Sequence, residues 1–230
     1  MWPRRMTSCA FTIGKSKTLW ACSRTPRSLP RSWIPNGHKK GIFQGVPRSG
    51  QRGLSFSFPG PRKLHEITKL PLLEKESSER ISEIWAAYHD ERADTYGTCL
   101  PGDALADLQA KAKKCPIFVL PVWRDEGHFM MLTQYQDTCF LLTFLEDYKV
   151  NPEGATPYAT ISMYDDLVAT KGLGLIRGDL TPNITKKEVA RLIRLLIRFY
   201  SPHAHHHVEA FNLRPEEFDL DKLMKDTPRE

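Results

Sequence analysis

The chain has 230 residues, with 33 Lys or Arg against 27 Asp or Glu and a net charge of +6. The positive excess is confined to residues 1–65, which hold 13 basic and no acidic side chains, whereas residues 66–230 hold 20 basic and 27 acidic ones, a net charge of −7. The net negative charge of residues 66–230 argues against a nucleic-acid surface on the folded part, since such a surface needs clustered Lys and Arg. No stretch reaches the roughly 18 apolar residues of a membrane helix, so we expect no nucleic-acid partner and no stable membrane insertion.

The first 65 residues have the composition of a transit peptide. They are rich in Arg, Ser, Pro and Gly and lack acids, as organellar presequences do. We therefore expect a basic, disordered or cleaved presequence over 1–65 and a single folded domain over 66–230. The alternative is a disordered basic arm that binds an acidic partner. The mitochondrion is the first expected compartment and the plastid the second, because both kinds of address share this composition.

The predicted domain opens with two helices and a strand. Apolar residues recur at helical spacing over residues 78–90, and the Ser-Ser pair at the start of this run predicts an N-terminal cap. Residues 94–100 predict a short strand that ends at a Pro-Gly pair. Asp103 is expected to cap a second helix over 104–114, which the following Cys-Pro ends because the residue before proline disfavours helix.

Three short apolar runs follow, rich in β-branched and aromatic residues. They predict strands over 117–122, 127–135 and 139–145, joined by tight polar turns as an antiparallel meander. We expect this meander at the centre of the sheet. Because proline donates no ladder hydrogen bond, Pro121 predicts that the first of these strands is an edge or is bulged.

The remainder predicts a sheet extended and covered by further elements. In chain order we expect a polar loop over 146–157, strands over 158–163 and 174–177, a helix over 186–200, a loop over 201–207, a strand over 208–212 and a helix over 215–224. Thr185 and Glu188 form a capping box at the start of the longest helix. Consecutive strands are close enough for hairpins, so the fold class is α+β: one mainly antiparallel sheet flanked by helices.

Two groups of residues carry side chains capable of catalysis or metal binding. Cys139 and His128 suggest a thiol–imidazole pair across the first hairpin of the meander, but Cys139 begins an apolar strand, where buried structural cysteines outnumber reactive ones. His203, His205, His206 and His207 have a spacing that allows imidazoles to share a metal ion, but no neighbouring Cys or carboxylate completes a site in the sequence. We therefore assign no catalytic residue, no cofactor and no metal.

Recognition chemistry is the remaining interpretation. Aromatic and Arg side chains at strand ends are the residues that protein–protein hot spots use. The predicted partner-binding residues are Trp123, Arg124, Phe211, Asn212, Leu213 and Arg214.

Three segments in consistent order resemble the mitochondrial ATP synthase F1 complex assembly factor 1 family. Residues 84–88 (IWAAY) match the family's IW-x-x-Y helix. Residues 115–129 (CPIFVLPVWRDEGHF) resemble its CP-x-F…LPR-x-EGY-x-FF segment, with His128 in place of Tyr and Trp123 inserted before the Arg. Residues 208–218 (VEAFNLRPEEF) are similar to its VETFNLRP-x-EF motif, the most specific of the three.

This resemblance implies a non-enzymatic chaperone of the mitochondrial matrix. Members of the family bind the unassembled β subunit of the ATP synthase F1 sector and prevent its self-association until the α subunit joins. By this resemblance the partner is the β subunit. Separately, we expect the chain to be a monomer. The alternatives left open are a small organellar hydrolase that uses Cys139 and His128, and a metal-binding regulatory module that uses the loop from His203 to His207.

Overall fold

The computed structural model of the protein describes residues 61–125, 127–227 and 229. Its first helix, α1 (Leu64–Ile67), already contributes to the core, since Leu64 is only 2% exposed. Folded structure therefore begins slightly ahead of residue 66. The predicted presequence over 1–65 lies almost entirely outside the described residues, and its disorder stays a prediction.

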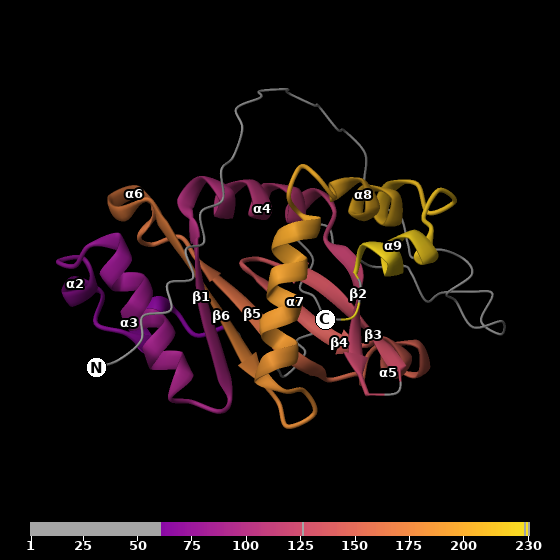
Figure 1. Ribbon diagram of the computed structural model, residues 1–230, viewed down its shortest axis with the longest axis horizontal. Coiled ribbons are helices and arrows are strands. Elements are labelled where there is room, and N and C mark those ends of the chain that lie inside the picture. Colours follow the sequence, from indigo (N-terminus) through magenta and orange to yellow (C-terminus); the bar gives the residue numbers. More distant parts are fainter. Residues whose placement is uncertain (1–60, 126, 228, 230) are drawn as a thin grey trace, which may run out of the picture.

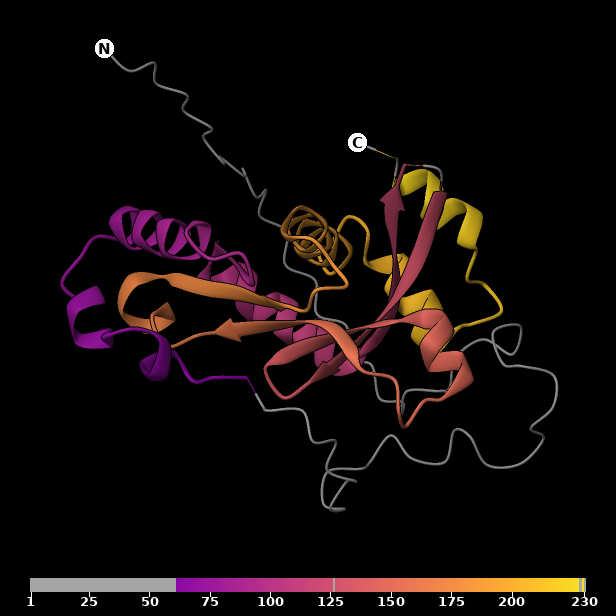
Figure 2. The ribbon, with the colours of Figure 1, turned by 90° about the horizontal axis from the view of Figure 1, so that it is seen from below.

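The described residues form one six-stranded sheet in which every neighbouring pair is antiparallel, in the order β1-β6-β5-β4-β3-β2. Its strands are β1 (Thr95–Pro101), β2 (Ile117–Arg124), β3 (Gly127–Gln136), β4 (Cys139–Phe144), β5 (Pro157–Tyr164) and β6 (Leu173–Leu180). All six were predicted from the sequence, and the α+β class is confirmed. Figure 2 shows the strong twist of the sheet, with β2 and β3 steeply inclined to β5 and β6.

Helices surround this sheet. Figure 1 shows α7 crossing it, α3 beside β1, and α8 and α9 beside β2. The further helices are α2 (Leu70–Leu73), α3 (Ser78–Asp90), α4 (Gly102–Lys114), α5 (Leu145–Val150), α6 (Val168–Lys171), α7 (Lys186–Phe199), α8 (His205–Leu213) and α9 (Leu220–Asp226). None of the helices in the described ranges combines the length and apolar character that a bilayer crossing requires.

Two glycines show how helices cover both faces of the sheet at β1 and β6. A Cβ atom at Gly178 would lie 2.8 Å from Cγ1 of Val189 in α7. Gly97 pairs with Arg177, the residue next to Gly178, so it belongs to the opposite face. A Cβ there would overlap the His89 ring of α3, whose Cγ lies 2.8 Å away. These strands are therefore packed between α3 and α7, and glycine permits the close approach.

The helix α7 contributes seven buried side chains to the core. The predicted capping box is present: the Thr185 hydroxyl accepts from the Glu188 N–H, and the Glu188 carboxylate accepts from the Thr185 N–H. The buried side chains on this helix are Val189, Ala190, Leu192, Ile193, Leu195, Leu196 and Phe199. Burial of the large ones stabilises the fold by on the order of 10 kcal/mol before the entropy cost.

The last predicted strand, over 208–212, is wrong. This segment belongs to the helix α8, which also takes in part of the predicted loop over 201–207. The buried residues of α8 are His207, Val208, Phe211 and Asn212, a spacing with the 3.6-residue period of a helix and not the alternation of a strand. Val208, Ala210 and Asn212 alternate in the sequence, but Ala210 is only half-buried.

Other differences are smaller. The polar loop expected over 146–157 begins with the helix α5, whose first turn carries two acidic residues that favour a helix N-terminus. Pro101, and not Asp103, is the N-cap of α4. The last helix begins at Leu220, where the Asp219 side chain accepts from two backbone N–H groups. The meander forms one half of the sheet and reaches its edge, so it is not central.

Candidate functional site

The strand β2 is an edge of the sheet, as Pro121 predicted. The main chain of Ile117 faces away from β3: its N–H donates to Oδ1 of Asn212 (3.2 Å), and its carbonyl accepts from Nδ2 of Asn212 (2.6 Å). Because alternate residues of an antiparallel strand point to the same side, the main chain of Val119, Pro121 and Trp123 also faces the open side. Pro121 therefore lacks an N–H where no neighbouring strand would accept from it.

Phe211 and Asn212, both predicted to bind a partner, lie in the interior. Their exposed fractions are 1% and 2%. Asn212 bonds the edge of β2, and its Nδ2 also donates to the Val208 carbonyl at 2.8 Å. The Phe211 ring meets Phe118 of β2 and Phe218 edge-on, with centroid distances of 5.8 and 4.9 Å. The most specific sequence motif of the chain thus holds α8 against β2.

Trp123 and Arg124 lie at the other end of β2, at the tip of its hairpin with β3. Trp123 is half-buried, and its Nε1 donates to the Thr227 carbonyl at 3.0 Å. Arg229 donates to the carbonyls of Arg124 and Asp125. Thr227 and Arg229, which follow α9, therefore contact this hairpin tip, and no pattern in the sequence predicts this contact.

Arg124 also ties the hairpin tip to the start of α7. Its Nε lies 2.7 Å from Oε1 of Glu188, and its Nη2 donates to the Asn183 carbonyl at 3.0 Å. The Glu188 hydrogen bond raises the pKa of Arg124. Burial pushes the pKa of Glu188 up, but the hydrogen bonds from Arg124 and Thr185 outweigh it and leave that pKa below its usual value. The Arg124 side chain remains about half exposed, at 52%.

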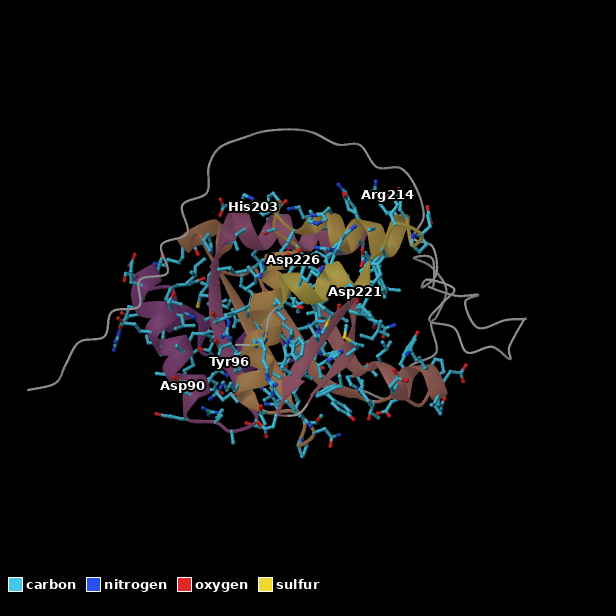
Figure 3. The ribbon with its side chains drawn as sticks, turned by 45° about the vertical axis from the view of Figure 1, so that its right-hand side comes forward. Asp90, Tyr96, His203, Arg214, Asp221 and Asp226 are labelled. Atoms are coloured by element: carbon cyan, nitrogen blue, oxygen red, sulfur yellow. The ribbon has the colours of Figure 1, made fainter. Side chains whose placement is uncertain are left out.

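Leu213 and Arg214 end α8. Leu213 is half-buried against the core, whereas Arg214 is exposed and pairs with Glu217 (Nε to Oε2, 3.3 Å); Figure 3 shows it at the outer surface. This end of α8 meets the start of β2, and Trp123 lies six residues further along the strand, about 20 Å away at ~3.3 Å per residue. The six predicted residues therefore fall into two groups at opposite ends of β2.

The structure does not bring Cys139 and His128 together. His128 lies in β3, near the end where it pairs with Trp123 of β2. Cys139 lies in β4 and pairs with Gln136 at the opposite end of β3. Burial, and secondarily the charge of Asp137, raises the pKa of Cys139 to about 11. A thiol with this pKa is protonated at neutral pH and is a poor nucleophile, so the thiol–imidazole alternative loses its geometric basis.

The histidines occupy several environments. His203 is exposed in the turn before α8, while His205, His206 and His207 form its first turn. His207 is 5% exposed, and its Nε2 lies 2.7 Å from Oδ2 of Asp226 in α9. Asp226 is 19 residues away in the sequence, so no local pattern could have indicated this carboxylate.

The architecture is a single α+β domain. The residues expected to bind a partner lie at the two ends of the edge strand β2, and Thr227 and Arg229 contact one of these ends. The chain belongs to the ATP11 protein family, whose family model matches residues 46–224. This confirms the resemblance inferred from the three sequence motifs.

Similar proteins carry consistent names. The human ATP synthase mitochondrial F1 complex assembly factor 1 is 24% identical over 194 residues, which cover 80% of this chain and 59% of the human protein. Its zebrafish (Danio rerio) counterpart is 25% identical over 165 residues, covering 70% of this chain and 54% of the relative. Protein atp11, mitochondrial, from Schizosaccharomyces pombe is 24% identical over 159 residues, covering 66% of this chain and 54% of the relative.

The chain therefore spans little more than half the length of these curated relatives. Their names agree on the mitochondrion, which confirms the first of the two expected compartments.

Proposed function

We propose that this chain is an assembly factor for the F1 sector of the mitochondrial ATP synthase. In this proposal it acts in the matrix as a non-catalytic chaperone, without a cofactor and as a monomer. It binds the unassembled β subunit and prevents β from associating with itself until α joins. The observation that carries the proposal is the family match over residues 46–224, together with relatives named as F1 assembly factors.

A physical reason supports a chaperone for an unassembled subunit. A subunit that is buried in a complex exposes apolar surface before its neighbour arrives, and large apolar patches promote aggregation. A chaperone that occupies such a face must also release it to the neighbour. A small interface centred on aromatic and Arg side chains can both bind the exposed face and release it, because a few such residues carry most of the binding free energy.

We propose the two ends of β2 as the surface that contacts the β subunit. Arg124 at the hairpin tip and Arg214 at the end of α8 present guanidinium groups to solvent, with side chains 52% and 48% exposed. Trp123 and Leu213 are half-buried beside them and offer apolar area. Phe211 and Asn212 are buried, so in this proposal they act by positioning α8 and β2.

The test is the recovery of soluble β subunit when it is co-expressed or refolded with the chain. Arg214→Ala is expected to reduce the recovered β, with Glu217→Ala as the matched control, since it removes the same ion pair and leaves the guanidinium. Arg124→Ala is compared in the same way with Glu188→Gln. If both Arg variants recover β as well as the wild-type chain, the surface is misplaced. If the wild-type chain neither binds β nor raises its recovery, the proposed function is wrong.

A further inference from the structure

Three side chains from α8 and α9 converge on one point at the surface. His206 and His207 are consecutive residues of the first turn of α8, and Asp226 ends α9. One ligand atom of each residue lies within 4.8 Å of the other two. Figure 3 labels Asp226 where α9 approaches α8. The helical conformation of residues 205–213, which the sequence pattern did not predict, brings these groups together.

The geometry of the group is partly fixed. His207 is buried at 5% exposure, and its Nε2 lies 2.7 Å from Oδ2 of Asp226. The His206 ring is exposed and lies beside that of His207, with centroids 4.1 Å apart and planes inclined by 36°. His207 is therefore held by its surroundings and by its hydrogen bond to Asp226, whereas the exposed His206 ring and the Asp226 side chain, 48% exposed, have room to adjust.

We propose that His206, His207 and Asp226 bind a divalent transition-metal ion, Zn²⁺ by preference. Two imidazole nitrogens and one carboxylate oxygen form a donor set suited to Zn²⁺, which binds such atoms at about 2.0–2.2 Å in tetrahedral geometry. Ligand atoms at this bond length lie ~3.3 Å apart. The ion takes the place of the proton between Nε2 of His207 and Oδ2 of Asp226, and this proton is released to solvent. The 2.7 Å contact between these two atoms then widens, while a rotation of the exposed His206 closes the remaining separations of up to 4.8 Å. Water completes the fourth position.

The surrounding charges limit the affinity. Asp226 is the only carboxylate in the group, and the cationic Arg198 of α7 acts on it electrostatically. A dication bound here is attracted by one formal negative charge, on Asp226, and repelled by one positive charge, on Arg198. We therefore expect weaker binding than at a thiolate-rich structural zinc site.

Metal binding would reinforce the C-terminal segment. Asp226 directly precedes Thr227, whose carbonyl accepts the hydrogen bond from Trp123. An ion shared by α8 and α9 would fix the end of α9 and, through it, the contact of Thr227 with the hairpin tip. The expected consequence is a higher unfolding temperature in the presence of Zn²⁺, because a ligand that binds only the folded chain stabilises it by mass action.

The experiment is a titration of the metal-free full chain with Zn²⁺ by calorimetry, and with Co²⁺ by visible absorption, which reports tetrahedral coordination. The wild-type chain is expected to bind one equivalent. His206→Ala and Asp226→Asn are each expected to weaken binding by more than about 10-fold, the loss that changes in outer-shell partners alone already cause at metal sites. His206 is exposed, so its replacement leaves the core intact.

The matched control is His203→Ala, since His203 is an exposed histidine of the same region outside the group. It is expected to bind Zn²⁺ as the wild-type chain does. Absence of saturable binding to the wild-type chain would overturn the proposal, as would equal affinity in wild type and His206→Ala, because the ion would then be held by other donors. A loss of binding in His203→Ala equal to that in His206→Ala would also overturn it.

Discussion

The side-chain amide of Asn212 completes the hydrogen bonding of Ile117 at the edge of the sheet. It accepts from the Ile117 N–H at 3.2 Å and donates to the Ile117 carbonyl at 2.6 Å. In effect the amide takes the place of one residue of an additional strand. It blocks lateral pairing at this end of β2, and Pro121, which has no N–H, weakens such pairing further along.

Replacement of Asn212 by Ala should destabilise the protein by about 1–3 kcal/mol, because the N–H and carbonyl of Ile117 then lose the buried amide that pairs with them. Urea unfolding followed by fluorescence measures the loss. Asn183→Ala is the control, since the Asn183 side chain is exposed and Arg124 bonds its backbone carbonyl, which the substitution keeps. A loss no larger than that of the control would mean that the amide bridge contributes nothing.

Phe211→Ala should cost about 3–5 kcal/mol, the usual range for an aromatic side chain removed from a core. Phe211 is 1% exposed and meets two other Phe rings. Leu72→Ala, at a position 56% exposed, should change stability by less than about 0.5 kcal/mol. Equal unfolding midpoints for the two variants would contradict the buried placement of α8.

Gly97→Ala should destabilise the contact between α3 and β1 by about 1–3 kcal/mol, because the added methyl group would overlap the His89 ring and approach Nε1 of Trp85 at 3.0 Å. Gly127→Ala is the matched control, since a Cβ there would meet nothing within 4 Å. The unfolding midpoint reports the change, as does the tryptophan fluorescence of the chain, to which Trp85 contributes. A Gly97→Ala chain as stable as Gly127→Ala would show that α3 does not pack as described.

His89 should make stability depend on pH. Burial, followed by the charges of Arg177, Arg92 and Lys186, lowers its pKa from 6.5 to about 4. Between these values the unfolded chain binds a proton that the folded chain does not, so stability from this group is complete above pH 6.5 and is lost as the pH falls toward 4. The loss is on the order of 3 kcal/mol.

The contribution of His89 is isolated by comparing unfolding free energies of wild type and His89→Asn between pH 7 and 4. The Asn amide preserves a hydrogen-bonding group for the Thr95 hydroxyl, which lies 2.9 Å from Nδ1 of His89, and does not titrate. The difference between the two chains should shrink as the pH falls. Parallel pH profiles would mean that His89 titrates alike in both states.

Local signals in the sequence were sufficient for most of the elements. The capping box at Thr185 and Glu188 located the start of α7, and short β-branched and aromatic runs located the strands, because these preferences act over a few residues. The strand prediction over 208–212 is wrong because it, too, rests on a pattern of only a few residues. Its short pattern fits a strand and a helix alike, and packing of Phe211 and Asn212 against β2 decides for the helix.

By itself, the sequence of this protein determined the α+β class, the positions of the strands, the edge character of the strand that holds Pro121, and the family. Only the tertiary structure decided that Phe211 and Asn212 are buried, that Trp123 and Arg214 lie at opposite ends of β2, and that Asp226 meets His207. The physical reason is separation along the chain. Contacts between residues many positions apart depend on how whole elements pack, and no local propensity encodes that packing.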